Sequence, residues 1–491
     1  MAGSVVVVGG GPGGYAAALG LARAGWQVRV VEAREVGGTC LQRGCIPTKA
    51  LLESARLAAD IARAAEFGIT AGPGGVDWPA VQARQSRLVG LLTNGLRGLL
   101  QQAGVQVDQA WATLLPPLAG AHPRVRIVPL GTHGAANTAG PGGKSGPPPA
   151  SLASPDCLIL TPDAVVLAPG SVPVRPAIPG MELPGVVDSD GLLAIADRPA
   201  SLCILGGGAI GCEFASAYTD LGTEVTLLEA LPQLLPRAEP DLARRLQAAL
   251  RRRGVTVRTD ARVQRIAEGP VVRVASGEGP AEDLAADAVL VAVGRRPATD
   301  GLGLAEAGVG RRPDGAIVVD AGLRTGATGV WALGDALGGP MVAHRAIHQA
   351  ATVVAAITGH PLPPVNTAIP QPVFCRPEVA WVGQTEAEAA AAGAGVAVAR
   401  VPLAALGRAQ AAGETDGLFK VVADGMGRVV GVHLIGSHAT ELIGAACVAL
   451  SVGARAEDLL NTMFPHPTLV EGLGEAAGLL LGRPLHVPSG R

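Results

Sequence analysis

A short stretch near the N-terminus most constrains what this chain can fold into. The apolar run from Val5 to Val8 leads into three glycines spaced as Gly-x-Gly-x-x-Gly, which are Gly9, Gly11 and Gly14. A helix-like segment follows, and then a second apolar run that ends at Glu32. Such glycines permit a tight turn and bring backbone N–H groups to a pyrophosphate, while the acid accepts a hydrogen bond from a ribose hydroxyl. The stretch therefore predicts a βαβ unit that binds a dinucleotide.

The same pattern occurs a second time. Gly206, Gly208 and Gly211 follow the apolar run LCIL, and the next apolar run ends at Glu229. In both copies the first glycine and the acid are 23 positions apart. One such motif would be weak evidence in a chain with 69 glycines, but two copies with one spacing predict two dinucleotide sites. An acid at this place suits a free 2′-hydroxyl and repels a 2′-phosphate, so Glu229 predicts NAD rather than NADP.

Composition excludes several classes of protein. With 491 residues, of which 48% are hydrophobic and 16% charged, the chain is globular and long enough for about three domains. The net charge of −2, without a basic run, argues against nucleic acid as a partner. No apolar stretch reaches the roughly 18 residues of a membrane span. The first apolar run has no basic segment before it, so we expect no signal peptide and a cytoplasmic location.

Two of the seven cysteines, Cys40 and Cys45, lie close together in GGTCLQRGCIPTKALL. A disulfide closing so small a ring would add only about 2 kcal/mol of stability, which a chain of this size does not need. A metal site would need two more ligands, and none lies near in the sequence. A redox-active pair is the favoured interpretation, with inert thiols and half a metal site as alternatives. We predict no metal.

This segment resembles the redox-active segment of the flavin-dependent pyridine-nucleotide disulfide oxidoreductases. The similarity covers nearly the whole chain, including VGRRPATDGLGL at 293–304, WALGDALGGPMVAHRAIHQA at 331–350, TDGLFK at 415–420 and HPTLVEGLGEAA at 466–477. It is greatest to the members that oxidise protein-bound dihydrolipoamide with NAD⁺. The resemblance implies an α/β fold with two Rossmann-like FAD/NAD(P)-binding domains plus a C-terminal α+β dimerisation domain.

The family order of parts gives the domain boundaries that we expect. They are an FAD-binding domain at 1–172, an NAD-binding domain at 173–295, a central domain completing the FAD site at 296–365 and an interface domain at 366–491. Residues 117–155 form a Gly/Pro/Ser-rich stretch within the first domain, and its composition predicts a flexible surface loop.

The resemblance also assigns the reacting groups. Cys40 matches the thiol that exchanges with substrate, and Cys45 matches the thiol that lies against the flavin. His466 matches the base, and Glu471 the acid that orients it. A thiol attacks a disulfide only as the thiolate, so the reaction needs such a base near pH 7.

Lys49 is a further candidate catalytic residue. The chain has only three lysines among its 39 basic residues, yet one of them follows Cys45 by four positions. A positive charge there favours the anionic forms of thiol and flavin. Family members pair this lysine with a glutamate that matches Glu213.

Two sets of residues match the cofactor contacts of the family. For a tightly bound FAD, one per subunit, they are Gly9, Gly11, Gly14, Glu32, Thr39, Lys49, Ala112, Gly170, Ser171, Asp335, Met341, Ala343 and His344. For NAD⁺/NADH as co-substrate they are Gly206, Gly208, Ala209, Ile210, Gly211, Glu213, Glu229, Val263 and Gly294.

The partners implied are a second copy of the chain and lipoyl proteins. In the family the base reaches the dithiol of the other subunit, so we expect a homodimer. The lipoyl partners are the lipoyl domains and subunit-binding domain of a 2-oxoacid dehydrogenase acyltransferase component, or the glycine cleavage lipoyl protein. Which of the two complexes recruits the chain, and whether another disulfide is preferred, stays open.

Other functions found among related enzymes fit the sequence less well. Glutathione-type reductases prefer NADPH, which Glu229 opposes, and mercuric reductase carries a C-terminal cysteine pair, whereas no cysteine follows Cys447 here. Soluble transhydrogenase lacks the complete dithiol, and a non-catalytic scaffold would not need it. The chain departs from the family pattern at Phe464, where a second histidine is common, and Pro465 follows it. This departure concerns the fine positioning of the base.

Overall fold

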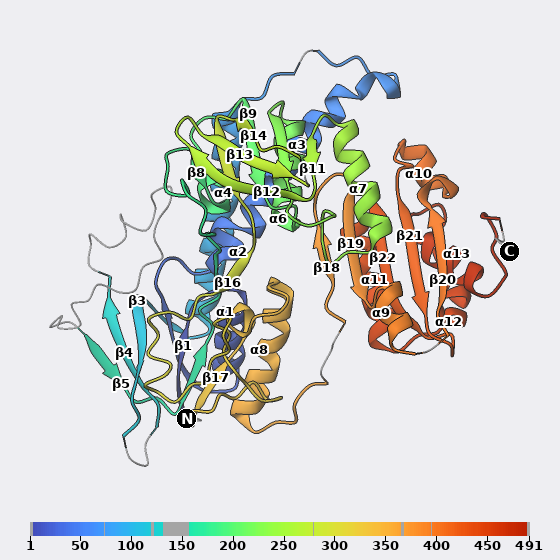
Figure 1. The fold of residues 1–491 in the computed structure, drawn as a ribbon. Coiled ribbons are helices and arrows are strands. Elements are labelled where there is room, and N and C mark those ends of the chain that lie inside the picture. The colour runs from blue at the N-terminus through green and yellow to red at the C-terminus, as the bar shows by residue number, and fades with distance from the viewer. Residues whose placement is uncertain are drawn as a thin grey trace.

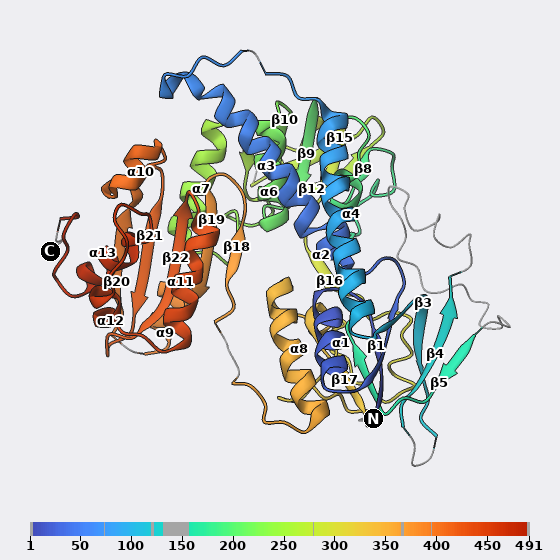
Figure 2. The same cartoon turned by 180° about the vertical axis from the view of Figure 1, so that it is seen from behind.

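The structure is a computed structural model that describes residues 3–72, 74–118, 122–130, 157–277, 279–364, 368–393 and 395–488. Three units are visible in Figure 1. Two of them are built on parallel sheets and lie one above the other, while the C-terminal unit stands to one side of both (Figures 1 and 2).

The first unit is a seven-stranded sheet in the order β17-β6-β1-β2-β3-β4-β5. Its strands are β1 Ser4–Val8, β2 Gln27–Glu32, β3 Gln106–Leu115, β4 Arg124–Pro129, β5 Leu158–Leu160, β6 Ala164–Leu167 and β17 Val330–Ala332. The strands from β17 to β3 are parallel, and β4 and β5 extend the sheet in antiparallel fashion. Its helices are α1 Pro12–Arg23, α2 Gly38–Arg43, α3 Cys45–Ala62, α4 Trp78–Gln102 and α8 Ala343–Thr358, with 3₁₀ turns η1 Ala64–Phe67 and η3 Gly334–Leu337.

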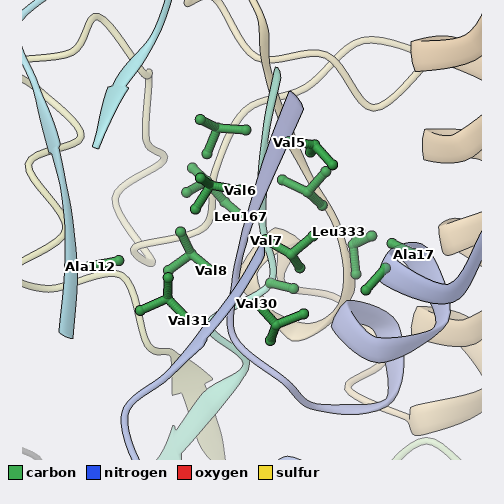
Figure 3. Packing of buried hydrophobic residues seen from close by; sticks show 14 of the residues in the cluster. Val5, Val6, Val7, Val8, Ala17, Val30, Val31, Ala112, Leu167 and Leu333 are labelled. Atoms are coloured by element: carbon green, nitrogen blue, oxygen red, sulfur yellow. The ribbon is translucent and has the colours of Figure 1, made fainter. Parts of the chain in front are cut away.

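The core of this unit follows from strands that are buried on both faces. Val5, Val6, Val7 and Val8 are all buried, as expected for a central parallel strand covered on each side. They pack with residues of α1, β2 and β6 and with Leu333 (Figure 3). Helices α1 and α8 lie side by side against the sheet (Figures 1 and 2).

Residues of the 296–365 segment pack with the first unit, because β17 joins the first sheet and Leu302, Ile317 and Val330 belong to the same hydrophobic cluster as β1. One expectation needs correction here. Within 117–155, the stretch predicted as a loop, residues 124–129 form β4, because alternate side chains such as Val125 and Ile127 are buried against the sheet. Most of the remainder of that stretch lies outside the described residues.

The second unit has the same βαβ arrangement as the first, built on a smaller sheet. Its parallel sheet has the order β11-β10-β9-β15-β8. The strands are β8 Val186–Val187, β9 Ser201–Leu205, β10 Glu224–Leu228, β11 Thr256–Arg258 and β15 Ala288–Val291, and the helices are α5 Ser189–Leu193, α6 Ala209–Asp220 and α7 Pro240–Arg252. Ser4 pairs with Gln27 in the first sheet and Ser201 with Glu224 in the second, so the repeated spacing yields the same register.

Two small sheets accompany the second unit. The three-stranded antiparallel sheet consists of β12 Ala261–Ala267, β13 Val271–Ser276 and β14 Glu282–Ala285. The two-stranded ladder pairs β7 Ser171–Pro173 with β16 Arg295–Pro297.

The C-terminal unit is an antiparallel sheet in the order β18-β19-β22-β21-β20 with helices packed on it. The strands are β18 Gln371–Val373, β19 Glu378–Gly383, β20 Ala397–Pro402, β21 Leu418–Ala423 and β22 Val429–Gly436. The helices are α9 Glu386–Ala391, α10 Gly407–Ala412, α11 Ala439–Ser451, α12 Ala456–Asn461 and α13 Glu471–Leu480, with the 3₁₀ turn η4 Leu403–Ala405. Among the described residues no helix is long and apolar enough to cross a membrane.

Candidate active site

The two cysteines lie where one helix ends and the next begins. Cys40 is in α2, Cys45 is the first residue of α3, and Gly44 joins the two helices. Both residues are thiols, and their side chains are hydrogen-bonded to each other. The two sulfurs are therefore close enough to exchange electrons.

The surroundings of the pair separate the two pKa values. The hydrogen bond from Cys40 and the nearby Lys49 ammonium together lower the pKa of Cys45 to about 7, against the opposing effect of burial. The same hydrogen bond and burial raise the pKa of Cys40. The N-terminus of α3 adds a positive partial charge at Cys45. Near neutral pH the pair therefore carries its negative charge on Cys45, with Cys40 as the donor.

Lys49 is held by residues of both other units. Its Nζ lies 2.9 Å from each carboxylate oxygen of Glu213, a buried residue of α6. It also lies 4.3 Å from the centre of the Phe374 ring, which follows β18. Tyr15 of α1 is close enough that burial, together with Cys40 and Cys45, raises the pKa of its hydroxyl. Sequence reasoning missed Phe374 and Tyr15, because no motif connects either residue with the dithiol.

The two acids that close the βαβ motifs have identical contacts. Glu32 accepts hydrogen bonds from the backbone N–H of Gly10 at 2.7 Å and of Arg34 at 2.9 Å. Glu229 accepts them from Gly207 at 2.7 Å and Leu231 at 2.8 Å. The prediction assigned these acids to a ribose hydroxyl. Their first role in the protein is to brace the glycine turn, and the remaining lone pairs stay available for a ribose.

The glycine turns fit the pyrophosphate that they are predicted to bind. Gly9 and Gly206 have φ of 102° and 109°, which favours glycine, and a side chain there would collide with the strand beside it. The middle glycines differ. A Cβ on Gly208 would meet no atom within 4 Å, and one on Gly11 only the Cα of Gly38 at 3.9 Å. These glycines cap α6 and α1 without a side-chain hydrogen bond, so N–H groups face open space suited to an anion.

A second group of polar contacts lies where the first unit meets 296–365. Ser171 donates a hydrogen bond to Asp335 at 2.6 Å and accepts one from Arg295 at 2.8 Å. Gly170 precedes Ser171 with φ of 76°, and Asp335 lies in η3. His344, in the first turn of α8, is held by the carbonyl of Pro370 at 2.9 Å, and burial lowers its pKa. Arg295 is a further polar residue that sequence reasoning missed.

The other predicted cofactor residues are distributed over both nucleotide units. In the first unit, Thr39 is in α2, Ala112 is buried in β3, Met341 lies two residues before α8, and Ala343 is its first residue. In the second unit, Ala209 and Ile210 form the first turn of α6, Val263 is in β12 and Gly294 follows β15. Gly14 and Gly211 lie directly against the carbonyls of Gly9 and Gly206.

The candidate base is part of an oriented pair on the C-terminal unit. His466 Nδ1 lies 2.8 Å from Glu471 Oε1, and Glu471 Oε2 accepts the N–H of Thr468 at 2.7 Å. Partial burial acts to raise the pKa of Glu471, but the hydrogen bonds from Thr468 and His466 lower it below its ordinary value. A carboxylate at Nδ1 leaves Nε2 as the proton acceptor. The imidazole is largely exposed, so Nε2 is accessible.

Phe464 has a structural role at the position where the family commonly has histidine. Its ring is partly buried against the core of the C-terminal unit and lies next to Gly474 of α13. Thr468 donates a hydrogen bond to the carbonyl of Pro465 at 2.6 Å, which closes the turn before the helix. The turn that carries His466 is thus fixed by packing and backbone contacts.

Within one chain the base and the dithiol are far apart. Helix α13, which begins at Glu471, lies at the outer side of the C-terminal unit, whereas α2 lies at the centre of the molecule (Figures 1 and 2). A single chain therefore separates the proton acceptor from the sulfurs.

Comparison with known proteins identifies the family of this chain. Residues 3–350 match the family model described as pyridine nucleotide-disulphide oxidoreductase, and residues 369–477 match the dimerisation domain of the same family. The chain belongs to the pyridine nucleotide-disulphide oxidoreductase family. Family members that act as dihydrolipoyl dehydrogenases use FAD and NAD, which confirms the two cofactors predicted from the sequence. The dimerisation domain indicates a homodimer.

Individual relatives of this family resemble the chain over nearly its full length. It is 37% identical to dihydrolipoyl dehydrogenase 3 of Pseudomonas aeruginosa, covering 98% of both chains, and 39% identical to the dihydrolipoyl dehydrogenase of Chlorobaculum tepidum, covering 96% of both. Among solved structures, LpdA from Mycobacterium tuberculosis has a TM-score of 0.84 at 27% identity, covering 96% of this chain and 98% of that one. The HOCl-induced flavoprotein disulfide reductase RclA from Escherichia coli has a TM-score of 0.80 at 31% identity, covering 97% and 99%.

Proposed function

We propose that the chain is the subunit that oxidises protein-bound dihydrolipoamide to lipoamide with reduction of NAD⁺. The observation that carries the proposal is the hydrogen-bonded Cys40–Cys45 pair, whose negative charge is stabilised on Cys45 beside Lys49. This pair lies in a unit whose glycine turn suits FAD, next to a second unit whose turn and Glu229 suit NAD.

The residues of the chain perform the thiol chemistry. His466 Nε2 takes the proton from one dihydrolipoyl thiol, and that sulfur then attacks Cys40 of the oxidised pair, breaking the Cys40–Cys45 bond. The second substrate sulfur attacks the first and passes its proton to the leaving Cys40 sulfur, which closes the lipoyl disulfide and releases Cys40 as the thiol. Cys45 keeps the electron pair as thiolate, stabilised by Lys49, and Glu471 steadies the imidazolium. FAD, when bound, supplies the passage of that pair to NAD⁺.

The proposal extends to partners, location and domain boundaries. The lipoyl partners are those of a 2-oxoacid dehydrogenase or glycine cleavage complex, and the homodimer brings His466 of one subunit to the dithiol of the other. Seven cysteines, odd in number and mostly scattered, do not resemble the disulfide framework of a secreted protein, which suits a cytoplasmic location. We also propose the domain boundaries at 172/173, 295/296 and 365/366 as family divisions of the chain.

A steady-state comparison tests the activity. The purified yellow protein is assayed with dihydrolipoamide, glutathione and Hg²⁺, each with NAD(H) and NADP(H), and Cys40→Ser serves as the control. We expect turnover of dihydrolipoamide with NAD⁺, lost in the control. Preference for another disulfide or for NADP(H) would contradict the proposal.

A further inference from the structure

All three units of the molecule meet at one ammonium group. Lys49 comes from the first unit, Glu213 from α6 of the second, and Phe374 directly follows β18 in the third. Lys49 Nζ contacts both Glu213 oxygens at 2.9 Å and lies 4.3 Å from the Phe374 ring centre. Because the ammonium acts on Cys45, the position of that ammonium matters to the dithiol.

Phe374 touches both members of the ion pair. Its backbone N–H donates to Glu213 Oε1 at 3.0 Å, while its ring is beside Lys49. The face of an aromatic ring attracts a cation, and more strongly when the cation is partly removed from water. The Lys49 side chain is 32% exposed, so without the ring the ammonium has water as an alternative partner.

The strand geometry explains why Phe374 faces this way. Val373 and Cys375, on either side of it, are both 1% exposed and belong to the core that the second and third units share. Side chains alternate along an extended chain, so burying these two residues turns Phe374 to the opposite side. Phe374 itself is only partly buried and is not part of that core cluster. A residue placed in this way contributes contact with Lys49 rather than core packing.

We propose that Phe374 is a positioning residue that, from the third unit, holds Lys49 beside Cys45 and so keeps the dithiol poised for reaction. Loss of the ring frees the ammonium to rotate toward water, which weakens its attraction for the Cys45 thiolate. The Glu213 carboxylate is still held by the backbone N–H of residue 374. Its negative charge then destabilises the Cys45 thiolate, because the ammonium balances less of that charge. The inference deepens the proposed function and rests on it.

Alkylation of Cys45 measures the effect directly. Trypsin cleaves after Arg34, Arg43 and Lys49, so Cys40 and Cys45 fall in separate peptides, 35–43 and 44–49. The holoprotein is reduced with a phosphine, treated with iodoacetamide at a series of pH values and analysed by mass spectrometry. Because Lys49→Met removes one cleavage site, the Cys45 peptide of those variants extends to Arg56.

We expect Phe374→Leu to slow alkylation of Cys45 at pH 7 about two- to threefold, because a smaller fraction is thiolate. Phe374→Tyr keeps the ring and should restore the original rate. In a Lys49→Met background, Phe374→Leu should cause no further change, since the ring acts through the ammonium. Phe67→Leu is the matched control, because Phe67 lies 5.8 Å from Arg63 on the surface, away from the dithiol.

Two results would overturn the inference: a wild-type pH profile in Phe374→Leu, or an equal effect with and without Lys49. The buried Cys203, Cys212 and Cys375 report on folding in the same digest. If they become reactive in Phe374→Leu, Phe374→Met, of similar size and without a ring, takes its place. The measurement uses no lipoyl substrate, so a failure of the proposed activity would leave its outcome unaffected and would be recognised separately.

Discussion

At the scale of single residues, the chemistry depends on how charge is placed around two sulfurs. Cys45 gains stability as a thiolate from the Cys40 thiol and from Lys49. Because its pKa is lowered to about 7, the thiolate is present above that pH and is lost as the pH falls below it. A hydrogen bond and a cation four residues along the helix thus place the reactive form of Cys45 in the physiological range.

Replacing Lys49 tests this charge placement. In Lys49→Met we expect alkylation of Cys45 at pH 7 to slow about three- to tenfold, with the pH profile displaced upward, because the thiolate loses a nearby cation and Glu213 loses its counterion. The midpoint potential of the bound flavin should become more negative for the same reason. Potentiometric titration and alkylation check the two effects, and an unchanged potential together with an unchanged profile would contradict the role of Lys49.

At the scale of elements, the two βαβ units show how one local pattern yields one geometry. In each, an acid at the end of the second strand braces the glycine turn, and the middle glycine leaves open space at the start of a helix. The turn thus keeps its shape without a ligand, and a helix N-terminus is directed at the open space.

Gly208→Ala separates nucleotide binding from folding. A Cβ at Gly208 meets no protein atom, so the fold and the FAD content should be unchanged, while the KM for NAD⁺ rises about tenfold because the methyl group occupies the space of the pyrophosphate. Gly206→Ala is the contrasting variant, since its φ of 109° and the adjacent Ala292 carbonyl make it destabilising. Kinetics and thermal melting distinguish the two, and an unaltered KM in Gly208→Ala would argue against this site.

A buried lysine of the third unit forms ion pairs with acids of the second unit. Lys420 in β21 is 2% exposed and contacts Glu239 at 2.7 Å, Asp241 at 3.2 Å and Glu386 at 2.6 Å. Lys420→Met should lower the free energy of unfolding by about 3–5 kcal/mol, because the buried Glu239 carboxylate loses its partner. Arg400→Met, which removes an exposed partner of Asp241 and Glu386, should cost about 1 kcal/mol or less. Denaturant titration of both variants measures the difference, and equal losses would contradict this reasoning.

At the scale of the whole molecule, a single chain does not bring its candidate base close to its own dithiol. The His466–Glu471 pair lies at the start of α13, which is on the outer side of the third unit, whereas α2, which contains Cys40, lies at the centre of the molecule (Figures 1 and 2). The dimerisation domain offers the solution, because a twofold partner can supply the base to each dithiol.

Mixed dimers test this arrangement. His466→Ala and Cys40→Ser homodimers should each be inactive with dihydrolipoamide. After dissociation and remixing in equal amounts, half of the dimers should be mixed, each with one intact site of two, so about a quarter of the original activity should return. Native mass spectrometry confirms that mixed dimers have formed. No recovery in their presence would mean that base and dithiol act within one chain.

The sequence by itself determined the local parts of this protein: the two βαβ units with one register, the dithiol at a helix start, and the histidine with its glutamate five residues later. Each depends on residues close together in the chain, where spacing dictates geometry. Only the tertiary structure decided that Phe374 lies beside Lys49, that residues 296–365 share the core of the first unit, and that base and dithiol are far apart in one chain. These relations join residues that are separated by hundreds of positions in the chain. They depend on burial and on packing between units, which leave no local spacing pattern in the sequence.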